Sequence, residues 1–270
     1  MTGGAGGAGG SSGGARISNG GAGLRHFTAL VLAAGLGKRM GSDLPKVLHP
    51  ALKRPLLIHV LGQIELLRPD RVVVVVGHRG SLVREALAGR VVRFAEQIPQ
   101  LGTGHAVQTA WAELEGGPGT ALVVAGDMPL VRAATLRRLL ERHEREGNGA
   151  TFLSGVLEDP KGYGRVIRDV SGEFVKIVEE KDATAPERAV AEVNSGIYCF
   201  ELEPLRLALG FLRADNRQQE YYLTDTLSII RSRGGRVGVE RASDPRELNG
   251  VNTPEQLKLV EEALRAFGET

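Results

Sequence analysis

The chain has 270 residues, of which 42% are hydrophobic and 24% are charged, and its formal net charge at pH 7 is +2. This balance predicts a globular protein with a substantial core, and it argues against a nucleic-acid partner because basic residues are scattered among almost as many acidic ones. No apolar run approaches the roughly 20 residues of a membrane-spanning helix, and no secretory leader is evident, so we expect a cytoplasmic protein without a membrane partner.

The first predicted elements alternate between strands and helices. Residues 1–26 are rich in glycine and serine, and we expect them to form a disordered tail. Strands are then expected at 27–34, 71–77, 91–96 and 120–127, and helices at 55–67, 81–89, 104–115 and 134–146. Apolar, β-branched runs separated by helices predict a doubly wound α/β fold, in which a mostly parallel sheet is covered on both faces.

The pattern changes after about residue 150. Strands expected at 150–158, 164–169, 173–180 and 192–201 suit a mixed or antiparallel extension of the sheet. Helices follow at 220–233 and 254–267, with a strand at 236–240 between them. We therefore divide the predicted domain, 27–270, into a half at 27–150, a half at 151–252 and a C-terminal helix at 253–270.

Polar, glycine-rich segments follow three of the predicted parallel strands: GLGKRMG, EQIPQLGTGH and GDMPL. Ligands of open parallel sheets bind beyond the carboxyl ends of the strands. Glycine lets backbone N–H groups approach phosphate oxygens, and Arg39 and Lys46 supply positive charge. The first segment therefore predicts a phosphate-binding loop, although its glycines also suit a simple tight turn. It matches neither a dinucleotide-binding fingerprint nor a Walker A loop.

A series of motifs occurs in one order along the chain: LAAGLGKRM, LPKVLH, QLGTGHA, GDMPL, GYGRV, VEEKDA, NSGIY, EYYLTD and GVNTPEQL. With this set the chain closely resembles the uridylyltransferase domain of bacterial N-acetylglucosamine-1-phosphate uridylyltransferases, over about residues 27–267. The resemblance implies a Rossmann-like nucleotidyltransferase sheet with a small mixed-β sugar-binding extension. It also implies UTP and N-acetylglucosamine 1-phosphate as substrates and Mg²⁺ as cofactor.

The resemblance further implies roles for individual residues. It assigns nucleotide binding to Leu32, Ala33, Ala34, Gly35, Arg39, Lys46, Gln97, Gly102, Thr103, Ala125, Gly126 and Asp127. It assigns sugar binding to Gly164, Glu179, Asn194, Tyr222, Thr224 and Asn252, and metal binding to Asp127 and Asn252. Arg39 and Lys46 are expected to face the UTP phosphates and to act in catalysis together with Asp127.

Several of these residues also suit purely structural roles. Thr103 fits an N-cap, Tyr222 fits a core position on a helix, and Asp127 fits a turn. The segment NTPEQ is typical of a helix start with Thr253 as its N-cap, which offers Asn252 a local role. These alternatives stay open at this point.

The implied reaction is an in-line attack of the sugar 1-phosphate oxygen on the α-phosphorus of UTP, with pyrophosphate leaving. The second pKa of a phosphate monoester is about 6, so the nucleophile is already anionic and needs no general base. Two alternatives remain: a sister sugar-phosphate nucleotidyltransferase that uses dTTP or CTP, and a catalytically silent sugar-nucleotide sensor. Since the family's β-helix acetyltransferase domain usually begins near Thr270, we expect no acetyl transfer and leave the oligomeric state open.

Overall fold

Parallel strands make up the first half of the main sheet in the computed structural model, which describes residues 1, 3, 24–35 and 37–268. They lie in the order β5, β4, β1, β6, and their bounds are β1 (Phe27–Leu32), β4 (Arg71–Val76), β5 (Arg93–Glu96) and β6 (Thr120–Ala125). Val31 lies between Val74 of β4 and Val124 of β6. The carboxyl ends of these strands therefore meet at one edge of the sheet.

The second half of the sheet is mixed. The strand β10 (Glu192–Glu201) runs antiparallel to β6 and to β7 (Ala150–Val156), and β11 (Val237–Arg241) pairs in parallel with β7. An antiparallel hairpin of β8 (Arg165–Arg168) and β9 (Phe174–Val178) joins β10. The predicted doubly wound sheet with a mixed-β extension is confirmed.

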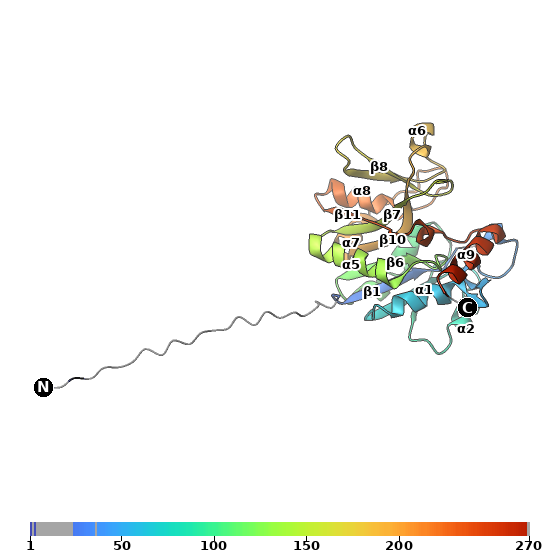
Figure 1. The fold of residues 1–270 in the computed structure, drawn as a ribbon, viewed down its shortest axis with the longest axis horizontal. Helices are drawn as coiled ribbons and strands as arrows, with labels where there is room; N and C mark the ends of the chain where they lie inside the picture. Colours follow the sequence, from blue (N-terminus) through green and yellow to red (C-terminus); the bar gives the residue numbers. More distant parts are fainter. Residues whose placement is uncertain (2, 4–23, 36, 269–270) are drawn as a thin grey trace.

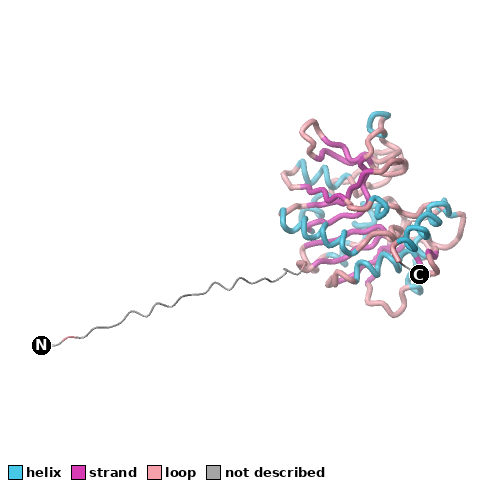
Figure 2. The backbone as a smooth tube through the Cα atoms, in the orientation of Figure 1, coloured by secondary structure: helices cyan, strands magenta, loops and turns pink. Residues whose placement is uncertain are grey.

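Helices cover both faces of this sheet. Alternate residues of β1 enter two different core clusters, with Ala29 and Val31 in one and Leu30 in the other. The first cluster is covered by α1 (Leu56–Glu65), α2 (Gly80–Ala86) and α5 (Ala133–Glu146). The second is covered by α3 (Thr103–Thr109), α4 (Trp111–Leu114), α7 (Leu202–Leu209) and α8 (Asp225–Ser232). Figure 2 shows the strands running through the middle of the body.

Smaller elements pack at the two ends of the molecule. The helix α9 (Pro254–Ala266) lies over a small third core cluster together with the short hairpin of β2 (Pro50–Ala51) and β3 (Arg54–Pro55). The remaining elements are α6 (Ala185–Arg188) and the 3₁₀ helices η1 (Lys38–Met40), η2 (Lys46–Leu48) and η3 (Pro245–Leu248). In Figure 1, α6, α8 and β8 lie at one end and α1, α2 and α9 at the other.

Some predicted elements are wrong in their bounds. The helix expected at 220–233 begins only at Asp225, because two backbone hydrogen bonds hold Tyr221 against the segment before α3. The Tyr221 N–H donates to the Leu101 carbonyl at 2.8 Å, and the Tyr221 carbonyl accepts from the Gly104 N–H at 2.7 Å. The helix expected at 104–115 is divided at Ala110 into α3 and α4, and α7 was missed altogether.

The expected disordered tail, residues 1–26, falls mostly outside the described part of the chain. Its last residues contact the body, because Arg25 forms an ion pair with Glu144 at 2.8 Å and His26 contacts the Asp70 carboxylate. Among the helices that the structure describes, none combines the length and apolar character needed to cross a bilayer.

Candidate active site

A cavity of about 540 Å³ opens at the carboxyl ends of the parallel strands. This is the edge where chain connections leave β1 and β6 in different directions, which is the usual ligand position in such sheets. Nine of the predicted nucleotide-binding residues line it: Leu32, Ala34, Gly35, Lys46, Gln97, Gly102, Thr103, Ala125 and Asp127. The structure therefore brings together three segments that are far apart in the sequence.

Two further predicted nucleotide positions lie behind the cavity wall. Ala33 is buried in the core and its N–H donates to the Val75 carbonyl at 2.9 Å. The Gly126 N–H donates to the Leu32 carbonyl at 2.9 Å, and a Cβ at Gly126 would lie 3.1 Å from that oxygen. Both residues thus join the strand ends and do not line the cavity.

The loop after β1 passes close to Lys46. Gly37 has φ 59°, and a Cβ there would lie 2.8 Å from the Lys46 Cβ, so this position requires glycine. Pro45, with φ −49°, leads directly into η2, whose first residue is Lys46. Arg39 is exposed and borders a second cavity of about 430 Å³, which Ala125, Asp127 and the Asn252 side chain also border.

Lys46 joins the two predicted metal ligands. Its ammonium group donates hydrogen bonds to Asp127 Oδ2 and, at 3.0 Å, to Asn252 Oδ1. The side chains of Lys46 and Asp127 are only 15% and 16% exposed, so this contact is largely shielded from water. A backbone hydrogen bond of 2.9 Å from the Val251 N–H to the Asp127 carbonyl holds the two ligand segments together.

The segment around Asn252 has the helix-start role that its sequence suggested. Its backbone N–H donates to Gln256 Oε1 at 2.7 Å, and the Thr253 hydroxyl accepts from the Gln256 N–H at 3.3 Å, so the segment does cap α9. The Asn252 side chain takes no part in that cap and points towards Lys46 instead. The helix start therefore positions the amide oxygen.

The donor set at this position fits Mg²⁺. A carboxylate and an amide oxygen already share one positive charge there, that of Lys46, and oxygen ligands are those that Mg²⁺ prefers. Within the described residues, no group of three or more His, Cys, Asp or Glu side chains is arranged to hold a metal ion. Asp127 and Asn252 would thus supply two ligands, and substrate phosphates and water would supply the others.

The segment from Gln97 to Thr103 forms one wall of the first cavity. Gln97 is buried and its amide donates to the Gly102 carbonyl at 2.9 Å. Gly102 has φ 102°, and a Cβ there would lie 2.7 Å from the Tyr221 carbonyl oxygen. The Thr103 hydroxyl accepts from the Leu223 N–H at 3.0 Å, while Gly102 is the N-cap of α3. The N-cap alternative for Thr103 is therefore wrong.

Four of the predicted sugar-binding residues form one cluster. The Thr224 hydroxyl donates to Glu179 Oε1 at 3.0 Å, and the Asn194 N–H donates to the Gly164 carbonyl at 2.9 Å. Burial raises the pKa of the Glu179 carboxyl above its ordinary value, against the opposing effect of the Thr224 hydrogen bond. None of the four lines the first cavity directly, but Tyr198, which does, accepts a 2.7 Å hydrogen bond from the Asn194 amide.

The hydroxyl of Tyr222 has its hydrogen-bond partners outside that cluster. This residue is buried in the loop before α8, so its alternative placement on a helix is wrong. Its hydroxyl donates to Asp182 Oδ2 at 3.0 Å and accepts from the Gln218 amide at 2.8 Å. Burial is the largest cause of the raised pKa of this phenol. Asn252 lies away from the cluster, beside Lys46.

Sequence reasoning missed several residues that line the first cavity. They include Gln100, Lys181, Gly196, Tyr198 and Glu220. Each lies within or beside a motif that was recognised, such as VEEKDA for Lys181 and NSGIY for Tyr198. The motifs therefore located the cavity better than the individual assignments did.

Comparisons with known proteins agree with this architecture. Residues 29–170 match the model of the MobA-like NTP transferase domain. The chain is 46% identical over 242 residues to the bifunctional protein GlmU of Caldanaerobacter subterraneus subsp. tengcongensis, covering 90% of this chain and 52% of that protein. It is 48% identical over 224 residues to the GlmU of Listeria monocytogenes serotype 4b, covering 83% and 49%. The chain thus spans about half the length of the curated relatives it matches.

A solved structure shares the fold. It is a putative glucose-1-phosphate thymidylyltransferase from Bacillus anthracis, with a TM-score of 0.70 and 17% sequence identity. The match covers 88% of this chain and 95% of that one. At this low identity, the similarity concerns the arrangement of helices and strands.

Proposed function

Because the chain belongs to the MobA-like NTP transferase family and is similar to GlmU proteins over most of its length, we propose that it transfers UMP from UTP to N-acetylglucosamine 1-phosphate. The products are UDP-N-acetylglucosamine and pyrophosphate. The observation that carries the proposal is the meeting of Lys46, Asp127 and Asn252 beside the cavity of predicted nucleotide-binding residues.

The chain's own residues contribute mainly charge and positioning. The sugar phosphate is anionic at neutral pH, so the attack on the α-phosphorus needs no general base. Lys46 and Arg39 neutralise charge on the triphosphate and on the leaving pyrophosphate. When Mg²⁺ is bound by Asp127 and Asn252, it supplies further charge neutralisation at the phosphates.

In this proposal, base and sugar selection belong to neighbouring groups of residues. The Thr103 hydroxyl accepts from the Leu223 N–H, which leaves its proton free to donate to a carbonyl of the uracil ring. The Glu179, Thr224 and Asn194 cluster adjoins this contact, because Thr224 directly follows Leu223, and its polar groups suit the hydroxyl groups and the acetamido group of the sugar.

The proposal assigns a function to each part of the chain. Residues 27–150 form the nucleotide-binding half, 151–252 the sugar-binding half, and 253–270 contain the C-terminal helix that positions Asn252. We place the activity in the cytoplasm, because UTP and sugar phosphates are made and consumed there.

A panel of substrates tests this function. Purified protein is incubated with Mg²⁺, with UTP, CTP or dTTP, and with N-acetylglucosamine 1-phosphate or glucose 1-phosphate, and pyrophosphate release is measured. We expect the highest kcat/KM for UTP with the N-acetylated sugar. A preference for dTTP or CTP would identify a sister nucleotidyltransferase, and tight nucleotide binding without turnover would identify a sensor.

A further inference from the structure

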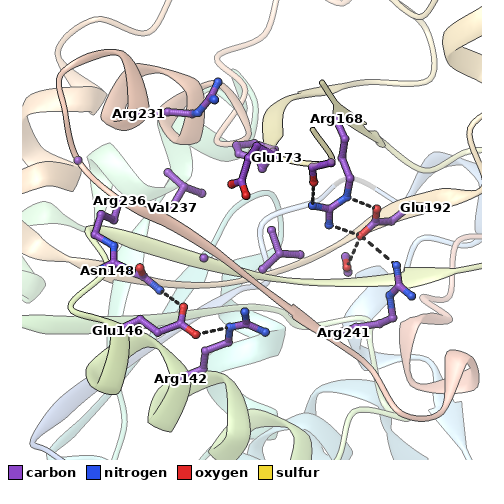
Figure 3. A pocket seen from close by; sticks show the side chains of 16 residues that line it. Arg142, Glu146, Asn148, Arg168, Glu173, Glu192, Arg231, Arg236, Val237 and Arg241 are labelled. Atoms are coloured by element: carbon purple, nitrogen blue, oxygen red, sulfur yellow. Dashed lines mark hydrogen bonds and ion pairs between the residues drawn. The ribbon is translucent and has the colours of Figure 1, made fainter. Parts of the chain in front are cut away.

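A third cavity, of about 690 Å³, lies along the edge strand β11. Its walls are the tip of the β8–β9 hairpin, the end of α8, the end of α5 and the strands β7 and β11 (Figure 3). It shares none of its lining residues with the two cavities of the candidate active site. Its volume is in the range of about 300–1,000 Å³ that is common for small-molecule sites.

Arginine dominates the charge of this cavity. Its lining contains Arg142, Arg168, Arg231, Arg236 and Arg241, together with Glu146, Glu173 and Glu192. The lining therefore carries an excess of two positive charges. A planar guanidinium with five N–H donors suits the oxygens of phosphate groups particularly well.

Two of the glutamates are already engaged by neighbouring side chains. Glu192 accepts hydrogen bonds from Arg168 Nε at 2.7 Å and Nη2 at 2.8 Å, and from the Ser154 hydroxyl at 2.8 Å. Burial alone would raise the pKa of Glu192, but the hydrogen bonds from Arg168 and Ser154 lower it, so the group is ionised. Glu146 pairs with Arg142 Nε at 3.0 Å (Figure 3).

Three of the arginines keep donors free. Arg241 lies 3.9 Å from Glu192 and Arg231 lies 4.0 Å from the Asp169 carboxylate, which is beyond hydrogen-bond distance in both cases. In the part of the chain that the structure describes, the guanidinium of Arg236 has no ion pair or hydrogen bond. Glu173 also faces the cavity and is the one acidic lining residue in the described chain without an ion pair.

The free arginines are spread along the cavity. Arg236 precedes β11 and Arg241 is its last residue, so their Cα atoms are about 16 Å apart at 3.3 Å per residue. Between them the lining contains buried polar side chains, Asn148 and Ser154, beside the half-buried Val239. A single phosphate would reach only one end of this arrangement, whereas an extended chain of phosphates would reach several guanidinium groups.

We propose that this cavity binds a linear polyphosphate group, such as that of a nucleoside triphosphate or an inorganic polyphosphate, through Arg231, Arg236 and Arg241. The site is independent of the proposed reaction, because none of these residues borders the candidate active site. Binding there depends on charge, and it should weaken steeply as the salt concentration rises.

Calorimetric titration with inorganic triphosphate, without divalent metal, tests this proposal. We expect the double variant Arg236→Gln/Arg241→Gln to bind about 100-fold more weakly at this site, or about tenfold for each lost charged donor. Arg206→Gln is the matched control, because Arg206 is 53% exposed on α7 and paired with Glu203 outside the cavity. It should bind as the parent protein does.

The candidate active site also attracts phosphates, so a Lys46→Met variant separates the two positions. The binding event at the arginine site should persist in Lys46→Met and should be lost in the double arginine variant. This pair of results would support the proposal. Full binding in the double arginine variant, or complete loss in Lys46→Met, would overturn it. A parallel titration with ATP shows whether a nucleoside strengthens or weakens binding at the arginine site, which assigns the source of the polyphosphate group.

Discussion

Lys46 lies beside the proposed phosphate-binding loop and contacts both proposed metal ligands, and its removal is the first prediction. Lys46→Met should lower kcat about 100-fold, because a positive charge near the leaving pyrophosphate is lost. The thermal midpoint should fall by only a few degrees, since about 1 kcal/mol corresponds to roughly 2–4 °C in a protein of this size. Turnover and thermal unfolding are measured on the same preparation.

Lys258→Met is the control for Lys46, because Lys258 is exposed on α9. It should leave both quantities unchanged. Near-parental turnover in Lys46→Met would mean that Arg39 and backbone amides hold the phosphates without it.

Asp127 is expected to be needed for metal-dependent turnover. Asp127→Ala should reduce kcat by about 100-fold or more, and excess chelator should stop the parent enzyme, because both changes remove charge neutralisation at the phosphates. Asp159→Ala, at another residue bordering the second cavity, is the comparison variant. Undiminished turnover in excess chelator would contradict the assigned metal role.

Asp225 gives a prediction about pH and stability. Burial, with the nearby Asp215 and Asp182 carboxylates, raises the pKa of Asp225 to about 6. The folded state therefore binds this proton more tightly than the unfolded state, so stability falls as the pH rises from about 4 to about 6. Asp225→Asn should be more stable than the parent by about 1 kcal/mol above pH 7, a value reduced for partial solvent exposure.

Thermal midpoints of Asp225→Asn and the parent are compared at pH 4.5 and pH 8. The difference should be clear at pH 8 and small at pH 4.5. An equal difference at both values would show that the ionisation of Asp225 does not contribute.

The contact between the segment before α3 and the loop before α8 is the critical one at the scale of elements. Gly102→Ala should destabilise the fold by about 2–4 kcal/mol, because φ is 102° and the new Cβ would lie 2.7 Å from the Tyr221 carbonyl oxygen. It should also raise the KM for UTP, because the Gln97–Gly102 wall of the cavity moves.

Gly116→Ala separates backbone strain from the loss of this contact. Gly116 has φ 70°, but a Cβ there meets nothing within 4 Å, so the substitution should destabilise by about 1 kcal/mol and leave the KM unchanged. Urea unfolding and UTP kinetics are measured for both variants. Equal effects of the two substitutions would contradict the importance of the contact with Tyr221.

The same contact shows where local sequence patterns fail. The five valines of the run RVVVVV are β-branched and form β4 as predicted, because their side chains are buried on both faces of the sheet. The segment EYYLT has a helical pattern but stays a loop, because the Tyr221 N–H donates to the Leu101 carbonyl and the Tyr221 carbonyl accepts from the Gly104 N–H. Such tertiary hydrogen bonds leave no periodic signal in the sequence.

At the scale of the whole molecule, the site depends on contacts between distant parts of the chain. Lys46 and Asn252 are 206 positions apart, yet their side chains are 3.0 Å from each other. No spacing rule predicts that contact, and only the family resemblance pointed to both residues. The strand order could be anticipated as doubly wound, and this places Lys46 and Asp127 at one edge of the sheet, but the return of the chain to Asn252 could not.

The most direct test of the account is an isotope measurement on the complete reaction. N-acetylglucosamine 1-phosphate carrying ¹⁸O at its non-bridging phosphate oxygens is incubated with UTP, Mg²⁺ and the protein, and the products are analysed by mass spectrometry. Attack by the sugar phosphate on the α-phosphorus predicts UDP-N-acetylglucosamine that keeps every label and pyrophosphate that carries none. Label in the pyrophosphate, or no UDP-sugar at all, would contradict the account.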